Sequence, residues 1–219
     1  MAARDYGQYC AITRALELVG ERWALLIVRD LLVGPRRYGE LAGGLPRIPS
    51  NILAARLKDL QSAGIIRRIP HSRVIVYELT PYGRELEPIV LALGAWGFKA
   101  LGDPREEQII TPDSMTMSLR TAFQPDVAAR FPATSYEADV GSAGLLVRVS
   151  GGTLQVTRRE DPGWEGAADL AFAAGPGIHR IISGELAPDE AVAAGVVRVL
   201  HGPGDLLNRF ASTFHLAAA

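Results

Sequence analysis

Apolar residues in the first third of the chain recur at the three- and four-residue spacing of helices that bury one face. The first such run ends at Gly20, which predicts a helix over 10–20 closed by a glycine in the left-handed conformation. The nearly continuous apolar block 23–32 predicts a second helix that is buried on most sides and forms the core of the first domain.

The next two predicted helices lie close together in the sequence. One covers 38–45, and a turn through 46–49 separates it from the other at 51–63. Ser50 is expected to cap the second helix at its start, and Gly64 is expected to terminate it. The order is helix, turn, helix, the arrangement in which the second helix enters the major groove of DNA.

Two β-rich runs follow, at 65–69 and 74–79, around the polar tip 70–73. They predict a hairpin in the position of a wing. A threonine-proline pair at 80–81 then opens a long amphipathic helix to about residue 101, with a kink or break expected at Pro88. Its apolar stripe has little to pack against in so small a domain, so a second copy of the chain is expected to cover it. The stripe consists of Leu86, Ile89, Val90, Leu93 and Trp96.

The pattern changes after the polar stretch 102–108, where short strands alternate with short helices. A threonine-proline pair at 111–112 signals a helix over 115–123, and the glycine pair at 151–152 signals a tight hairpin turn. The fold class expected of this half, and of the whole chain, is α+β. Further strands are predicted at 136–140, 145–149, 153–157, 168–173 and 196–200, and further helices at 178–183, 188–194 and 204–214.

Length and charge both favour two domains. At 219 residues the chain is long enough for two small cores. Residues 1–100 hold 14 Lys and Arg against 9 Asp and Glu, whereas the remainder holds 9 against 15. A basic half favours contact with a polyanion, and the acidic half is expected to face away from it. We predict a DNA-binding domain over 1–102, a linker over 103–112 and a second domain over 113–219.

The predicted helix 51–63 has two distinct faces when it is projected at the helical period. Its leucines are expected to face the core, whereas Asn51 on the opposite face can pair with adenine and Lys58 can reach a base edge or a phosphate. Arg56 projects near the core flank, where it either contacts phosphate or supports the fold. The alternative, a merely solvated helix face, is disfavoured by the adjacent hairpin. The outward face consists of Asn51, Ala54, Ala55, Lys58 and Ser62, with Ser50 at the helix start.

Basic side chains flank this helix in the sequence. Those before the helix pair can contact the DNA backbone, and those on the hairpin suit phosphate contact or insertion into the minor groove. A solvated surface charge explains any one of them as well, so the prediction depends on their joint placement. They are Arg36 and Arg37 before the helices, and Arg67, Arg68, His71 and Arg73 on the hairpin.

Four segments of the first half together resemble the HxlR-type regulators, a bacterial branch of the winged-helix superfamily. They are CAITRALELVGERW (10–23), LLVGPRRYGEL (31–41), NILAARLKDL (51–60) and YELTPYG (77–83), and the resemblance runs from about residue 7 to 102. It implies a homodimer, joined through terminal helices, that binds double-stranded DNA at a palindromic operator with one recognition helix per half-site.

Cys10, the single cysteine, begins the first of these segments. In some members of the family a cysteine at the matching position senses oxidants or electrophiles. The resemblance therefore implies a second hypothesis, a thiol redox-sensing regulator with a purely structural C-terminal domain. Arg14, one helical turn away, could lower the pKa of the thiol. A structural cysteine is the alternative, and Ala11 stands where these regulators usually have a proline.

The second half resembles the sterol carrier protein type 2 family over roughly residues 113–215. The similar segments are ADLAF (168–172), SGELAPDEA (183–191), GVVRV (195–199) and GPGDLLNRF (202–210). The resemblance implies a curved sheet with helices around an apolar tunnel, and a small apolar effector as its ligand. An ordinary closed core is the alternative. Candidates to line the tunnel are Phe172, Ile178, Ile182, Leu186, Phe210 and Phe214.

Other chemistries find no support in the sequence. The four histidines are scattered, no spacing fits a metal site, and no catalytic serine or phosphate-binding loop is present, so neither enzyme activity nor a cofactor is expected. The apolar runs are too short to span a membrane and the chain starts without a signal peptide, so we expect a cytoplasmic protein. The last alternative is a lipid carrier whose basic head does not bind DNA.

Overall fold

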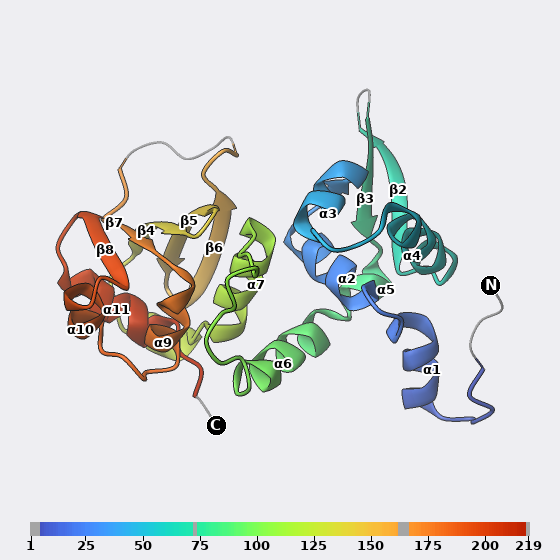
Figure 1. Ribbon diagram of the computed structural model, residues 1–219, viewed down its shortest axis with the longest axis horizontal. Helices are drawn as coiled ribbons and strands as arrows, with labels where there is room; N and C mark the ends of the chain where they lie inside the picture. Colours follow the sequence, from blue (N-terminus) through green and yellow to red (C-terminus); the bar gives the residue numbers. More distant parts are fainter. Residues whose placement is uncertain (1–4, 72–73, 162–166, 218–219) are drawn as a thin grey trace. The chain divides into compact units, whose positions relative to one another are not determined.

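The computed structural model describes residues 5–71, 74–161 and 167–217, and the chain divides into two compact units, 1–90 and 91–219 (Figure 1). Both helices and strands occur in each unit, so the α+β fold class is confirmed. None of the helices within the described residues combines the length and the apolar composition needed to cross a membrane.

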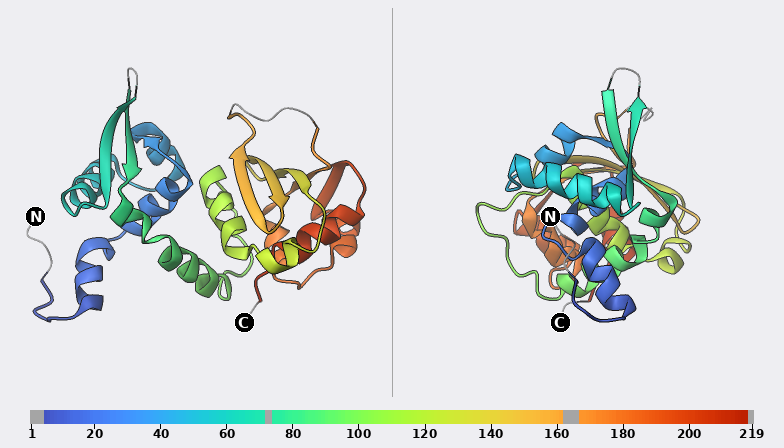
Figure 2. Two further views of the ribbon diagram at one scale, coloured as in Figure 1. Left: turned by 180° about the vertical axis from the view of Figure 1, so that it is seen from behind. Right: turned by 90° about the vertical axis from the view of Figure 1, so that its right-hand side faces the viewer.

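The first unit packs helices around α2, whose side chains Ile27 and Val28 are fully buried. Its antiparallel sheet has the order β1-β3-β2, and the hairpin of β2 and β3 stands out from the helices (Figures 1 and 2). The elements are α1 (Ala11–Val19), α2 (Ala24–Val33), β1 (Arg36–Arg37), α3 (Tyr38–Gly44), α4 (Ser50–Ser62), β2 (Ile66–His71), β3 (Val74–Leu79) and α5 (Pro81–Arg84). The predicted helix pair and wing are therefore present.

Two of the predicted helix caps are wrong. Gly20 has φ −75° in the right-handed region, and its N–H donates to the carbonyl of Leu16, so α1 ends without a left-handed residue. Ser50 is the first residue of α4, and the extended Pro49 precedes it as the cap without a side-chain hydrogen bond. Gly64 does follow α4 in the left-handed conformation, with φ +70°. Only the glycine lacks the Cβ that makes this conformation costly.

The single long helix predicted from 82 to 101 is two helices. α5 ends at Arg84, and α6 (Glu87–Phe98) begins anew, with Pro88 in its first turn. Proline has no backbone N–H and its ring collides with the carbonyl four residues earlier, so the helix breaks one turn before it. Of the kink or break predicted at Pro88, the break is confirmed.

The second unit is a five-stranded sheet of order β6-β5-β4-β7-β8 with helices, in which only the β4–β7 pair is parallel. Gly151 and Gly152 form the predicted turn between β5 and β6, both with positive φ (55° and 78°), as a tight hairpin turn of this kind requires. The elements are α7 (Pro112–Ala122), α8 (Pro125–Ala128), β4 (Thr134–Val140), β5 (Ala143–Ser150), β6 (Thr153–Arg158), β7 (Leu170–Ala174), η1 (Pro176–Ile178), α9 (His179–Ile182), α10 (Pro188–Ala193), β8 (Val197–His201) and α11 (Asp205–Thr213).

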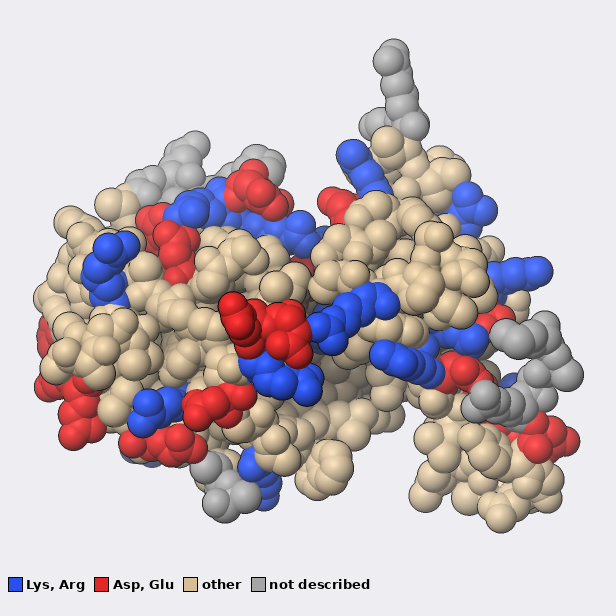
Figure 3. Space-filling view, in the orientation of Figure 1, with Lys and Arg blue, Asp and Glu red and all other residues tan. Residues whose placement is uncertain are grey.

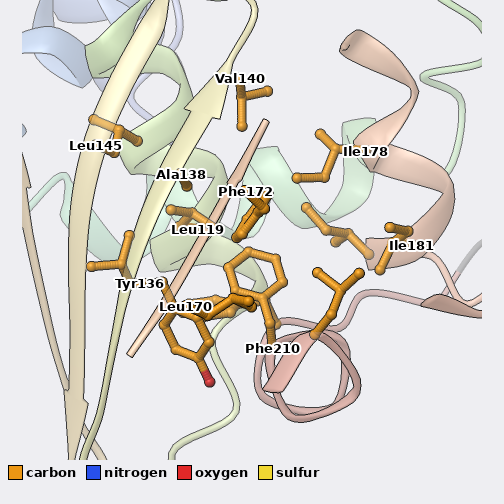
Figure 4. Packing of buried hydrophobic residues seen from close by; sticks show 14 of the residues in the cluster. Leu119, Tyr136, Ala138, Val140, Leu145, Leu170, Phe172, Ile178, Ile181 and Phe210 are labelled. Atoms are coloured by element: carbon orange, nitrogen blue, oxygen red, sulfur yellow. The ribbon is translucent and has the colours of Figure 1, made fainter. Parts of the chain in front are cut away.

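One face of this sheet carries the core of the unit. Along β4, Tyr136, Ala138 and Val140 are fully buried and alternate with partly exposed residues, while Leu119 of α7 and Phe210 of α11 join the same cluster (Figure 4). The opposite side of β4 is polar, with Glu137 and Asp139 both bound by Arg159. The helices therefore cover a single face.

Five of the six residues proposed to line a tunnel lie in this closed core. The Phe210 ring lies 5.1 Å from that of Phe172 and 4.7 Å from that of Phe214, and all three side chains are fully buried (Figure 4). Burial among these rings also raises the pKa of Tyr136 to about 12. The alternative of an ordinary closed core therefore fits these five residues, whereas Leu186 borders an open hollow.

Candidate nucleic-acid interface

A side-chain hydrogen bond fixes the start of α4 against α3. The Tyr38 hydroxyl, at the first residue of α3, donates to the Ser50 carbonyl at 2.8 Å. The bond ties together the first turns of the two helices, and with them the angle at which α4 is presented. Sequence reasoning missed this role for Tyr38, because a partner 12 residues away leaves no periodic signal.

The two faces of α4 are arranged as the projection predicts. Leu53, Leu57 and Leu60 are at most 2% exposed. On the other side Asn51 and Lys58 are exposed, between side chains small enough to let a helix approach a groove closely. Of the remaining predicted residues, Ser50, Ala54 and Ser62 are exposed and Ala55 is half-buried. The geometry brings these side chains onto one continuous surface, and their contact with DNA stays a prediction.

Arg56 supports the fold. Its side chain is 9% exposed, and its guanidinium pairs with Asp59 at 2.7 Å and with Glu21 at 3.7 Å. The second contact joins α4 to the turn before α2. Of the two predicted roles, the structure favours support of the fold. The Arg56 guanidinium is too buried to point to solvent, where a phosphate could reach it.

Replacing Arg56 with Met is expected to lower the free energy of unfolding of the first unit by about 1–2 kcal/mol, because the charged hydrogen bond to Asp59 within α4 and the ion pair to Glu21 in the turn before α2 are both lost. Hydrogen exchange of the α4 amides measures this loss. Arg67→Met is the matched control, with an expected change within about 0.5 kcal/mol because that guanidinium is 58% exposed. Unchanged protection in Arg56→Met together with weakened DNA binding would instead assign Arg56 to phosphate contact.

The hairpin arginines differ in how firmly they are held. Arg67 pairs across the hairpin with Glu78, its register partner, with Nε donating to Oε1 at 2.7 Å. Arg68 lies over the ring of Tyr77, 5.8 Å from its centroid, and is exposed. Because neighbouring strand residues point to opposite faces, the two guanidinium groups cannot serve the same side of the wing. His71, at the end of β2, is exposed, and Arg73 lies outside the described residues.

The arginines before α3 form part of the wing sheet, which the sequence did not predict. Arg36 and Arg37 make up β1 and pair with Tyr77 and Val76 of β3. A strand of two residues is too short to show any alternation of apolar and polar positions. Arg37 is exposed and Arg36 half-buried, so Arg37 is the better placed of the two for a contact at the surface. Figure 3 shows basic and acidic side chains interspersed on the visible face of each unit, with basic side chains among those that stand out from the first unit.

Cys10 is exposed and caps the N-terminus of α1. The backbone N–H groups of Thr13 and Ile12 lower the pKa of its thiol, as expected where helix amides face a thiolate. Arg14, the residue expected to do this, instead pairs with Glu17 at 3.1 Å. Across the described ranges, no three His, Cys, Asp or Glu side chains gather in a way that could hold a metal ion.

These features define the class of the first unit. Two helices with α4 exposed on its outer face, beside a three-stranded sheet whose hairpin forms a wing, make a winged helix-turn-helix domain. Residues 18–104 match the HxlR-like helix-turn-helix family.

Relatives with this domain are bacterial. An uncharacterized HTH-type transcriptional regulator of Mycobacterium tuberculosis, Rv3095, is 43% identical over 97 residues, which are 43% of this chain and 61% of that protein. YvaP of Bacillus subtilis, named in the same way, is 37% identical over 86 residues, which are 38% of this chain and 80% of YvaP. The solved reduced form of the transcriptional regulator YodB from B. subtilis is 33% identical over 44% of this chain and 100% of the solved chain, with a TM-score of 0.38.

This chain belongs to the HxlR-like helix-turn-helix family. The resemblance of its first half is thereby confirmed. The chain spans 61% of the length of the mycobacterial relative.

Proposed function

We propose that this protein is a homodimeric transcription regulator that binds double-stranded DNA at a palindromic operator, as a repressor or an activator. The observation that carries the proposal is the outer face of α4, where exposed Asn51 and Lys58 flank small side chains. This surface suits the major groove, with Asn51 reading an adenine and Lys58 reaching a base edge or a phosphate. Arg37, Arg68 and His71 supply contacts to the DNA backbone beside it.

Replacing Asn51 with Ala is expected to weaken binding to the operator by about 10- to 100-fold, since a bidentate contact to a base is lost. Fluorescence anisotropy with a labelled fragment of the protein's own promoter region measures the affinity at fixed salt. Lys58→Ala is expected to weaken binding as well and to reduce its salt dependence.

The control is Gln155→Ala, which removes an exposed amide from β6 of the second unit. Wild-type affinity in both the Asn51 and the Lys58 variants would refute α4 as the reading surface. The chain would then be better described by the alternative of a lipid carrier whose basic head does not bind DNA.

The dimer is proposed to form through the terminal helices of the DNA-binding domain. On α6, Trp96 is 75% exposed and Leu93 45%, while on α1 Ile12 is 72% and Leu16 49% exposed. Exposed apolar side chains on each of these helices mark surfaces that another chain can cover. A two-fold dimer places one α4 on each half-site, which accounts for a palindromic operator.

The second unit is proposed to be a sterol carrier protein-like domain that binds a small apolar effector. Its mixed sheet with helices on one face supports this proposal. The limits proposed for the domains are 1–102 for DNA binding, 103–112 for the linker and 113–219 for the effector domain. Effector binding would alter DNA affinity only if the DNA-bound and free arrangements of the dimer bind the effector differently.

A second candidate function, thiol redox sensing, is favoured by Cys10. The thiol is exposed and its pKa is lowered by backbone amides at the start of α1, which raises the fraction of reactive thiolate near neutral pH. In this form of the regulator the C-terminal domain is purely structural.

Alkylation of Cys10 by iodoacetamide is therefore expected to have a pH midpoint below that of a free cysteine thiol. Mild oxidation is expected to change DNA affinity and, on non-reducing electrophoresis, to yield a linked dimer. Cys10→Ser should abolish both effects. An unchanged DNA response to oxidant in Cys10→Ser would dismiss the redox hypothesis.

A further inference from the structure

A hollow of about 730 Å³ lies along the outward face of α11 in the second unit, beside the closed core, whose residue Ile181 also lines it. Its apolar walls come from separate parts of the chain: Val127 of α8, Ile181 of α9, Leu186 of the following loop and Leu216 near the chain end. This volume lies in the range of about 300–1,000 Å³ that receives small organic molecules. The core around Phe210 is filled, because its ring packs against those of Phe172 and Phe214.

The polar groups of the hollow are neutral amides, a hydroxyl and an imidazole. No Asp, Glu, Lys or Arg lines it, although the second half of the chain carries an excess of acidic residues. Gln124 donates its amide to the His215 carbonyl at 2.8 Å, and the Ser212 hydroxyl donates to the Asn208 carbonyl at 2.9 Å. Among the side chains that the structure describes, none pairs with the Asn208 amide or the His215 ring, so both groups can serve a ligand.

The position of the His215 ring depends on a glycine. A Cβ on Gly184 would lie 3.1 Å from Cε1 of that ring, and Gly184 has φ +78°, which disfavours any other residue. The chain end is also tied to the rest of the unit, since the N–H of Leu216 donates to the Ile182 carbonyl at 2.9 Å. The polar rim of the hollow is thus held in place by the backbone.

We propose that this hollow is the effector site and that it takes a neutral, mostly apolar small molecule with a carbonyl or hydroxyl group, which bonds to Asn208 or His215. The proposal rests on the proposed function, in which the second unit senses an effector. A carboxylate or an amine would lose part of its hydration here without meeting a Lys, Arg, Asp or Glu side chain, so this lining favours a neutral ligand. The apolar walls supply the contact area.

Residues 179–186, which line the effector hollow, also line a second hollow beside the end of α6. Ile181, Gly184 and Leu186 face the effector hollow. Their neighbours His179, Ser183 and Glu185 line a second hollow of about 240 Å³ together with Phe98, Lys99 and Asp103, at the end of α6 and in the linker. A ligand that displaces this segment on one side therefore changes the support of the linker on the other. Occupancy of the site can in this way bias the helix proposed for dimerisation.

The test uses Nile red, a neutral, apolar fluorophore with a carbonyl group, added to the full chain. Ser212→Trp places a large side chain into the hollow from an exposed helix position. Ser118→Trp is the matched control, because Ser118 is also exposed and also donates to the carbonyl four residues earlier, at 3.0 Å, but does not border the hollow. Nile red fluorescence is expected to show one saturable site in the wild type and in Ser118→Trp. Affinity should be about 10-fold lower or worse in Ser212→Trp.

Equal binding of Nile red to Ser212→Trp and to Ser118→Trp overturns the site. Tighter binding of the anionic dye anilinonaphthalene sulfonate than of Nile red at this site overturns the ligand class. Operator affinity, measured with and without Nile red, tests the proposed function separately. Selective loss of dye binding in Ser212→Trp with no effect of the dye on wild-type operator affinity supports the site and refutes the effector role. If Nile red still changes the operator affinity of Ser212→Trp, the second unit keeps its effector role, but the effector does not bind in this hollow.

Discussion

Replacing Trp96 with Glu is expected to convert the proposed dimer to a monomer and to weaken operator binding by about 100-fold or more. Trp96 is 75% exposed on α6, beside Leu93 and Ile89, which are 45% and 51% exposed. A charge at the centre of the dimer contact would have to be buried without a partner. A monomer engages one half-site at a time and so loses the gain that comes from linking two binding events, typically about 10²- to 10⁴-fold.

Light scattering after size exclusion measures the oligomeric state, and anisotropy with the labelled promoter fragment measures affinity. Leu200→Glu is the matched control, because it places the same charge at another half-exposed apolar position, in β8 of the second unit. A Trp96→Glu protein that stays dimeric would refute α6 as the dimer contact. A monomeric variant with wild-type affinity would refute the requirement for two half-sites.

Much of the fold could be predicted from the sequence where one periodic signal dominates. The leucines of α4 are spaced so that only one face can enter the core, and the structure buries those side chains while exposing Asn51 and Lys58. The turn at Gly151 and Gly152 was predictable because both positions require positive φ. Local chemistry alone determines these features.

Features that depend on contacts distant in sequence could not be predicted. The pairing of Arg36 with Tyr77 and the hydrogen bond from Tyr38 to Ser50 join segments that carry no shared pattern. The sequence left open whether Arg56 contacts phosphate or supports the fold, because its projection near the core flank fits both. Its burial and its pairing with Glu21 and Asp59 favour support of the fold. Tertiary contacts override local preference at each of these positions.

The second half shows the same limit. Its aromatic residues fit both a tunnel lining and a closed core, since both environments are apolar, and only the ring contacts of Phe210 distinguish them. The hollow beside α11 could not be predicted because its lining comes from three separated segments, 124–127, 181–188 and 208–217. The lining contains no Asp, Glu, Lys or Arg, a property that becomes visible only when the segments are brought together.

Replacing Phe210 with Ala is expected to destabilise the second unit by about 3–5 kcal/mol, the usual cost of removing a fully buried aromatic side chain. The Phe210 ring lies 5.3 Å from that of Tyr136 and 5.1 Å from that of Phe172, in edge-on geometry, so its loss leaves a cavity between α11 and the sheet. Hydrogen exchange of the β4 and β7 amides measures the effect on this unit alone, since the two compact units need not unfold together.

The conservative variant Phe210→Leu is expected to lose less, because it retains much of the buried volume, and Leu200→Ala at a half-exposed position is expected to change stability by about 0.5 kcal/mol or less. If the unit instead encloses a tunnel at this point, a shortened side chain would enlarge a cavity that already exists, and Phe210→Ala would cost little stability. Nile red would then bind at a second site in that variant. A small loss of hydrogen-exchange protection together with additional Nile red binding would therefore favour the tunnel over the closed core. A large loss of protection would support the closed packing around Phe210.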